Sequence, residues 1–179
     1  MAIKFYPEIP QGTPEWFELR NGVITATDAY DLLHGKSLEQ IIFNKTNNSF
    51  KGNYYTKRGH ILEEEAKAIY SEVYEPLENF GFIKNDKYPN AGCSPDGVTV
   101  SRKGLVECKA FNEKRHFQVY KNLDAHIIAQ IQFQLFISEF EWDDLVLYNP
   151  DLSAEDAFLV RRLYPDKELH KRFAELLGK

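Results

Sequence analysis

Apolar residues recur at helical spacing between residues 57 and 75. Leu62, Ala66, Ile69 and Val73 fall three or four positions apart, and residues with this spacing lie on one face of a helix. The pattern predicts a long amphipathic helix whose apolar side, Val73 included, faces the core.

Capping signals predict shorter helices nearer the N-terminus. Thr13 followed by Pro14 is typical of a helix start, and Gly22 of a helix end. Thr27 is predicted to be the N-cap of a second helix. The expected helices span residues 14–22, 27–35 and 37–44, and a polar surface loop is expected over residues 45–55.

The second half of the chain contains runs that predict strands, with a hairpin turn over Ser101 to Gly104. The expected strands span residues 79–84, 97–101, 104–111, 143–149 and 157–164, and further helices are expected over 113–123, 125–139 and 166–178. This order favours an α/β (α+β) fold in which helices flank a central mixed β-sheet. The length of 179 residues suits a single domain over residues 1–179.

Composition and charge narrow the function only slightly. Hydrophobic residues make up 43% of the chain and charged residues 27%, which is ordinary for a globular protein. A net charge of -5 argues mildly against a general nucleic-acid binder, but catalytic carboxylates that bind cations would account for part of it. No apolar run is long enough for a membrane span and no signal peptide is evident, so we expect a cytoplasmic protein without membrane partners.

The two cysteines, Cys93 and Cys108, are too few for a four-cysteine zinc or iron–sulfur site. We therefore expect them to be reduced thiols, and we look for chemistry among the carboxylates.

Asp96, Glu107 and Lys109 form the most informative constellation in the sequence. Asp96 begins one predicted strand, and Glu107 and Lys109 lie two positions apart on the next. Alternate side chains of a strand share a face, and the hairpin turn brings Asp96 back beside them. An ion pair on a half-exposed strand is the alternative interpretation. The apolar neighbours make isolated charges costly there, which favours a site.

Phosphodiester hydrolysis requires this set of groups. Carboxylate oxygens suit Mg²⁺ or Mn²⁺, which activate water and stabilise the leaving oxygen. A neighbouring lysine can orient or deprotonate the water, or neutralise charge on phosphorus. In this interpretation Asp96 and Glu107 hold the metal together with the backbone carbonyl of Cys108, and Lys109 acts on the water. We expect Mg²⁺, with Mn²⁺ as a substitute and two ions at the site.

Glu63 is a third candidate carboxylate, within the run from Glu63 to Glu65. Such a run is usually a solvated helix face. Glu63, however, shares the inner side of the predicted helix with Ala66 and Tyr70, and it is therefore a possible metal ligand.

Five segments together resemble the phage lambda exonuclease / YqaJ viral recombinase family, a branch of the PD-(D/E)XK nucleases. They occur in the family's order and are residues 16–27, 59–63, 93–97, 105–109 and 129–132. The resemblance implies a PD-(D/E)XK restriction-endonuclease-like core with Asp96 and Glu107 as metal-binding acids and Lys109 as the catalytic lysine. It also implies that Glu63 belongs to the site and that Gln130 positions water or the lysine. An ordinary buried hydrogen bond is the alternative for Gln130.

Arg20, Thr27 and Ser94 suggest an anion pocket beside the metals, since arginine binds phosphate bidentately and a helix N-terminus attracts anions. The resemblance implies that this pocket holds the terminal phosphate of the 5′ strand. A plain N-cap for Thr27 and a surface ion pair for Arg20 are the alternatives.

The resemblance implies a Mg²⁺-dependent 5′→3′ exonuclease that degrades one strand of double-stranded DNA from its ends and leaves 3′ single strands for recombination. A phage or prophage origin, a single-strand annealing protein as partner and a homotrimer are implied too. Two other hypotheses remain open, namely an endonuclease or nuclease of single-stranded or branched DNA, and a non-catalytic DNA-binding protein on the same scaffold.

Overall fold

The computed structural model describes residues 2–47 and 57–178. The strands are β1 (Ile3–Tyr6), β2 (Leu77–Glu78), β3 (Phe82–Asn85), β4 (Gly92–Cys93), β5 (Gly97–Thr99), β6 (Gly104–Lys109), β7 (Trp142–Tyr148) and β8 (Phe158–Leu163). The helices are α1 (Pro14–Asn21), the 3-10 helix η1 (Ala26–Asp28), α2 (Ala29–Leu33), α3 (Leu38–Asn47), α4 (Lys57–Val73), α5 (Glu113–Lys121), α6 (Ala125–Ser138), α7 (Ala154–Ala157) and α8 (Lys167–Leu177).

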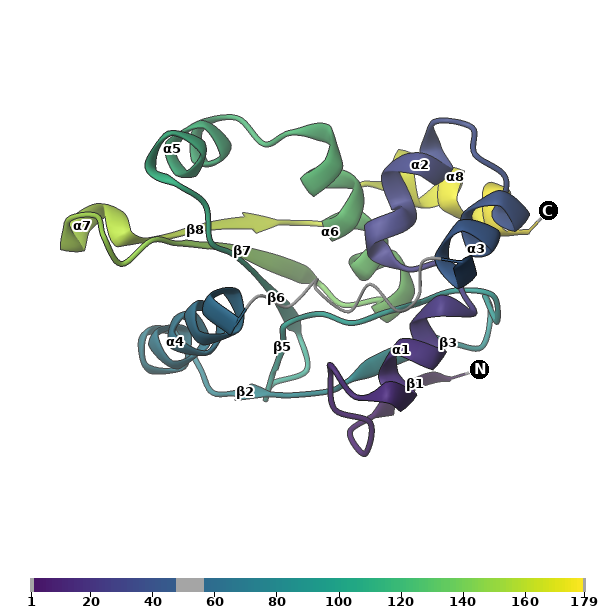
Figure 1. Cartoon of the computed structure of the whole chain (residues 1–179), viewed down its shortest axis with the longest axis horizontal. Helices are drawn as coiled ribbons and strands as arrows, with labels where there is room; N and C mark the ends of the chain where they lie inside the picture. Colours follow the sequence, from purple (N-terminus) through teal and green to yellow (C-terminus); the bar gives the residue numbers. More distant parts are fainter. Residues whose placement is uncertain (1, 48–56, 179) are drawn as a thin grey trace.

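Two sheets organise the fold (Figure 1). The larger sheet has the strand order β2-β5-β6-β7-β8. Strand β6 pairs parallel to β7, and the other pairs of this sheet are antiparallel. The predicted mixed sheet flanked by helices is thus confirmed. A smaller antiparallel sheet, β1-β3-β4, was not predicted.

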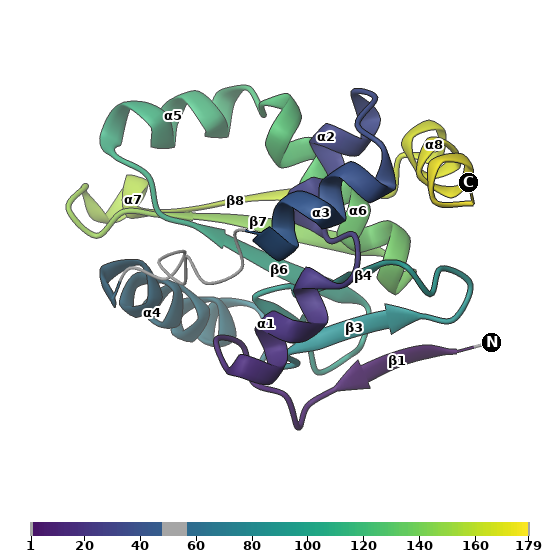
Figure 2. The ribbon, with the colours of Figure 1, turned by 45° about the vertical axis from the view of Figure 1, so that its right-hand side comes forward.

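The larger sheet is covered on both faces, as expected for its apolar strands. On one face α4 packs Leu62, Ala66 and Tyr70 against Val106 and Val146. On the other face α6 joins the main core, and both views place α4 and α6 on opposite sides of β6 (Figures 1 and 2). This layering places β6, which carries Glu107 and Lys109, between two helices.

The prediction that Val73 faces the core is wrong, because this residue is 61% exposed. It is the last residue of α4 and is followed by the exposed Tyr74. Tyr70, three residues earlier in α4, is fully buried instead.

Helix α6 has well-defined ends and connects the two parallel strands. The Asp124 side chain caps its start by accepting from the backbone N–H of Ile127 at 2.9 Å. Glu139 ends it in the left-handed conformation with φ of 60°. Parallel strands need a long crossover, and α5 with α6 provides the one between β6 and β7.

The capping signals of α1 are confirmed, because Thr13 Oγ1 accepts from the Trp16 N–H at 3.3 Å and Gly22 is the C-cap. The predicted N-cap role of Thr27 is wrong. Thr27 lies inside η1, and α2 begins only at Ala29.

The reason lies in the turn that precedes α2. Asp28 Oδ2 accepts from both the backbone N–H of Thr25, at 2.9 Å, and its hydroxyl, at 3.0 Å. The backbone N–H of Asp28 in turn donates to the Thr25 carbonyl at 2.9 Å. These contacts tighten the turn into a 3-10 geometry, so the N-cap residue is Thr25, two residues earlier than expected.

The predicted strand over residues 79–84 is only partly confirmed, because β3 begins at Phe82. The short strand β2, which ends at Glu78, was not predicted and belongs to the other sheet. Between them Gly81 lies against the N-terminal segment, where an added Cβ would stand 1.4 Å from the Ile9 carbonyl oxygen. Glycine permits this close approach. The missed elements β4 and α7 are too short for a periodic signal.

The loop expected over residues 45–55 is partly wrong, since residues 45–47 continue α3. The remainder of that expectation falls outside the described residues. Among the helices that the structure describes, none combines the length and apolar character needed to cross a membrane.

Candidate active site

The β5–β6 hairpin brings Asp96, Glu107 and Lys109 together. Asp96 immediately precedes β5, and its Oδ2 accepts from the backbone N–H of Cys108 at 2.7 Å. Glu107 and Lys109 project from the same face of β6, with Lys109 Nζ 3.4 Å from Glu107 Oε2. Two carboxylates and one ammonium thus converge, as the strand alternation predicted.

Two glutamines of α6 hold the Glu107 carboxylate. Gln130 Nε2 donates to Oε2 at 3.2 Å, and Gln134 Nε2 donates to Oε1 at 2.9 Å. Gln130 therefore contacts the cluster, as does Gln134, which was not predicted. Its position four residues after Gln130, on the same helix face, was a usable signal.

Glu63 approaches the cluster from α4 and lines two hollows of about 240 Å³ each. One hollow is also lined by Cys108 and Lys109, and the other by Asp96. Glu63 Oε2 is 3.7 Å from Lys67 Nζ. As expected, Ala66 and Tyr70 on its face are buried whereas Glu64 and Glu65 are exposed.

His60 is a further residue near the cluster that was not predicted. Its ligand atom and those of Glu63 and Glu64 lie within 4.8 Å of one another. His60 also lines both hollows. The spacing of three residues between His60 and Glu63 places them on one helix face, but such spacing is common among solvated helix residues.

Burial and like charge dominate the electrostatics of the cluster. Burial raises the pKa of Asp96 well above its ordinary value, and the Glu107 and Glu63 carboxylates raise it further. Burial also raises the pKa of Glu63, and there the Lys67 ammonium opposes the effect. Burial alone would lower the pKa of Lys109, but the Glu107 and Asp96 carboxylates raise it above its ordinary value.

The donor set fits a hard divalent cation. Asp96, Glu107 and Glu63 offer carboxylate oxygens of the kind that Mg²⁺ and Mn²⁺ prefer. When all three carboxylates are ionised, Lys67 and Lys109 balance only part of the negative charge. A divalent cation would remove the repulsion that raises the carboxylate pKa values.

The three candidate phosphate-binding residues are joined through Trp16. Arg20 Nη2 donates to Thr27 Oγ1 at 3.3 Å, and the Arg20 guanidinium carbon lies 4.7 Å from the centroid of the Trp16 ring. Trp16 Nε1 donates to Ser94 Oγ at 3.1 Å and to the Gly81 carbonyl at 2.7 Å. Trp16 was missed as an organiser because a tryptophan in an amphipathic helix usually signals only the core.

Comparison with known proteins identifies the family of this chain. The YqaJ-like viral recombinase domain matches residues 15–141. The chain belongs to this family. Its YqaJ-like region includes every residue of the cluster and of the phosphate pocket. A search of curated proteins found no matching sequence.

Solved structures resemble the YqaJ-like chain over almost its whole length. An alkaline exonuclease from Laribacter hongkongensis, LHK-Exo, is 27% identical with a TM-score of 0.77 over 93% of this chain and 91% of that one. The same enzyme in complex with dAMP gives 25% identity and a TM-score of 0.74, with the same coverage. A phage-related exonuclease from Haemophilus somnus 129PT, at 17% identity and a TM-score of 0.56 over 90% and 93% of the chains, shares the fold. The fold is therefore that of the PD-(D/E)XK nucleases.

Proposed function

We propose that the chain is a metal-dependent deoxyribonuclease that digests double-stranded DNA from its ends in the 5′→3′ direction and leaves 3′ single strands. The convergence of Asp96, Glu107 and Lys109 on the hairpin carries the proposal. Membership of the YqaJ-like family and the likeness to alkaline exonucleases support a nuclease. A non-catalytic scaffold would be expected to lack one of these groups, and all three are present.

The metal site in this proposal consists of Asp96, Glu107 and Glu63, with the backbone carbonyl of Cys108. Cys108 donates its N–H to Asp96. In a strand the N–H and C=O of one residue point to the same side, which supports the carbonyl as a ligand. Bound Mg²⁺ or Mn²⁺, in our proposal two ions, would polarise the phosphate and lower the pKa of a bound water.

The protein groups around this site orient the reactants. Lys109 presents its ammonium beside Glu107, where it can stabilise charge that develops on the phosphate or hold the attacking water. Gln130 and Gln134 keep the Glu107 carboxylate in one orientation, as polar neighbours of metal ligands commonly do.

The direction of digestion rests on the pocket of Arg20, Thr27 and Ser94. Arg20 and Thr27 are in direct contact, and Ser94 is tied to them through Trp16. A guanidinium and two hydroxyls suit a terminal phosphate. We therefore propose that the pocket holds the 5′ phosphate of the strand being digested.

Digestion of end-labelled linear duplexes tests the proposal. We expect release of nucleotides from the 5′ end with Mg²⁺, no release when the metal is chelated, and faster digestion of 5′-phosphorylated than of 5′-hydroxyl ends. The Lys109→Ala variant is the control for a contaminating nuclease. Rapid cutting of closed circular DNA would favour an endonuclease, and degradation from the 3′ end would contradict the proposed polarity.

The homotrimer and the single-strand annealing protein are also proposals, derived from the resemblance. Light scattering of the purified chain would measure its mass in solution, and a monomer at working concentration would contradict the trimer. Mixing with an annealing protein from the same source would test the partner by co-elution.

A further inference from the structure

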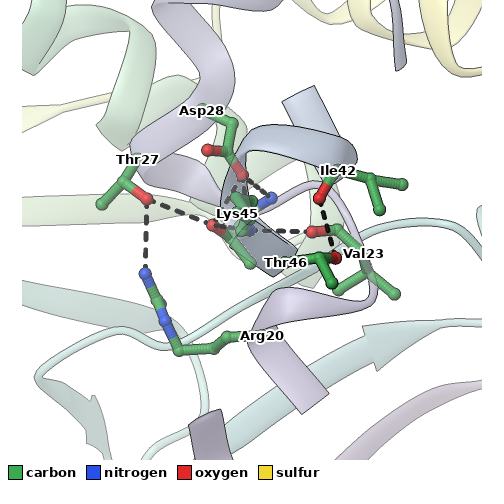
Figure 3. A network of polar contacts seen from close by, with 8 residues as sticks. Arg20, Val23, Thr27, Asp28, Ile42, Lys45 and Thr46 are labelled. Carbon is green, nitrogen blue, oxygen red and sulfur yellow. Dashed lines mark hydrogen bonds and ion pairs between the residues drawn. The ribbon is translucent and has the colours of Figure 1, made fainter. Parts of the chain in front are cut away.

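A buried lysine of α3, Lys45, joins this helix to the turn that carries Thr27 (Figure 3). Its Nζ donates to Asp28 Oδ2 at 2.7 Å, to the Val23 carbonyl at 2.8 Å and to Thr25 Oγ1 at 3.2 Å. An ammonium group has three donors, and all three are used here. The side chains of Lys45 and Asp28 are only 15% and 14% exposed.

Hydrogen bonds lead from Lys45 to the phosphate pocket. Thr25 Oγ1 donates to Asp28 Oδ2 at 3.0 Å and lies 3.2 Å from Thr27 Oγ1. A hydroxyl has one proton, so the proton between the two threonines comes from Thr27. Thr27 Oγ1 in turn accepts from Arg20 Nη2 at 3.3 Å. The direction of donation is therefore Arg20 to Thr27 to Thr25 to Asp28. Figure 3 shows the contact between Arg20 and Thr27 at the start of this series.

A simple mechanical attachment of α3 would not need a charge. Burial lowers the pKa of Lys45 to about 8, although the Asp28 carboxylate opposes this effect. Apolar residues often replace buried ion pairs without loss of stability. The specific benefit of the lysine is that its three donors set the position of the Thr25 and Asp28 acceptors at the same time.

We propose that Lys45 is a positioning residue for the 5′-terminal phosphate of DNA. By fixing the turn from Thr25 to Asp28, it holds the Thr27 hydroxyl and the Arg20 guanidinium in the arrangement that receives the phosphate. The inference rests on the proposed function of the pocket and adds a residue of α3, outside the pocket itself, on which end recognition depends.

The test compares duplexes that differ only in a 5′ phosphate or a 5′ hydroxyl. The quantity measured is the ratio of their kcat/KM values in the wild type, Arg20→Ala, Lys45→Met and Lys36→Met. We expect Lys45→Met to lower the ratio about tenfold, towards that of Arg20→Ala, as loss of one charge-assisted hydrogen bond would. Lys36→Met is the matched control and should keep the wild-type ratio. Its lysine pairs with Asp31 at 3.3 Å on the surface, at 50% and 46% exposure.

Thr25→Val is a second variant that keeps the shape of the side chain and removes the hydroxyl between Lys45 and Thr27. It decides the matter if Lys45→Met does not fold, and we expect it also to lower the ratio. A phosphate preference that is lost in Arg20→Ala but intact in the folded Lys45 and Thr25 variants would overturn this inference alone. A wild type indifferent to the 5′ phosphate would overturn the pocket, and the inference with it, while cleavage could still stand.

Discussion

The carboxylate cluster at Glu107 and the polar network at Lys45 bury charge in opposite ways. In the cluster, burial and neighbouring carboxylates raise the pKa values of Asp96 and Glu63. In the network, Lys45 meets Asp28 at 2.7 Å and each of its donors has an acceptor in the chain. Like charges held together destabilise a folded protein, whereas matched groups hold their neighbours in place. The cluster is thus suited to bind an external cation, and the network to position residues.

The Asp96→Asn substitution should separate catalysis from stability most clearly. It removes a carboxylate oxygen from the proposed metal site. We expect the cleavage rate to fall about 10³-fold, which corresponds to several kcal/mol of lost transition-state stabilisation. Stability at pH 8 should stay equal or increase, because a neutral amide avoids the repulsion by Glu107 and Glu63. Single-turnover cleavage and urea unfolding measure the two effects. A large loss of stability would contradict the view that the cluster is strained by like charge.

The Lys109→Ala substitution tests the ammonium that lies 3.4 Å from Glu107 in the cluster. We expect cleavage to fall about 10²-fold, as for loss of a group that assists proton transfer or stabilises charge in the transition state. DNA-end binding in Ca²⁺ should change little, because the metal-binding carboxylates remain. Cleavage rates and fluorescence anisotropy check both expectations, and a fully active variant would remove Lys109 from the mechanism.

The Gln134→Leu substitution tests whether α6 orients the Glu107 carboxylate. Gln134 donates to Oε1 at 2.9 Å, and we expect about a tenfold loss of cleavage or of apparent Mg²⁺ affinity, as for other polar neighbours of metal ligands. Titration of the cleavage rate with Mg²⁺ separates the two. The control is Gln40→Leu on α3, where the Gln40 side chain donates to the exposed Asn44 at 3.1 Å, and it should behave as the wild type.

The Asp143→Asn substitution should give the smallest effect on cleavage, and its effect on stability should be about 1 kcal/mol for each pH unit over which the folded carboxyl is protonated and the unfolded one is ionised. Asp143 is fully buried on β7, and neither carboxylate oxygen has a hydrogen-bond partner in the described part of the chain. Burial raises its pKa well above 3.8, and the Glu107 and Asp144 carboxylates add to the rise. The folded carboxyl therefore stays protonated where the unfolded one is ionised, and its contribution to stability is lost as pH rises above about 4.

Asparagine does not titrate, so the stability advantage of Asp143→Asn over the wild type should grow between pH 4 and pH 8. Urea unfolding at several pH values measures it. Asp151→Asn, at an exposed position, makes the same change of charge and is the matched control. An advantage that does not vary with pH would show that Asp143 is ionised in the folded chain.

Local rules were enough to predict the cluster. Glu107 and Lys109 share a face because a strand alternates, and Asp96 returns beside them because a short hairpin joins the two strands. Gln134 could have been found in the same way, one helical turn after Gln130. The resemblance to the YqaJ-like family then extended the prediction to Glu63, which spacing alone left open.

The phosphate pocket depends on contacts that no local rule provides. Trp16 reaches Ser94 across 78 positions of the sequence, and Lys45 reaches Thr25 across 20. The N-cap expected at Thr27 was wrong because the Asp28 side chain draws in Thr25 and tightens the turn. A lysine in a polar helix carries no sequence signal that it is buried.

By itself, the amino-acid sequence determined the mixed sheet, the capped helices α1 and α6, and the identity of the three groups on the hairpin. These follow from side-chain periodicity and capping, which act over a few residues. Only the tertiary structure decided which helices cover β6, where Glu63 meets the cluster and how Lys45 supports Arg20. Those features depend on the packing of segments distant in sequence, where burial and charge pairing act between elements and leave no periodic pattern along the chain.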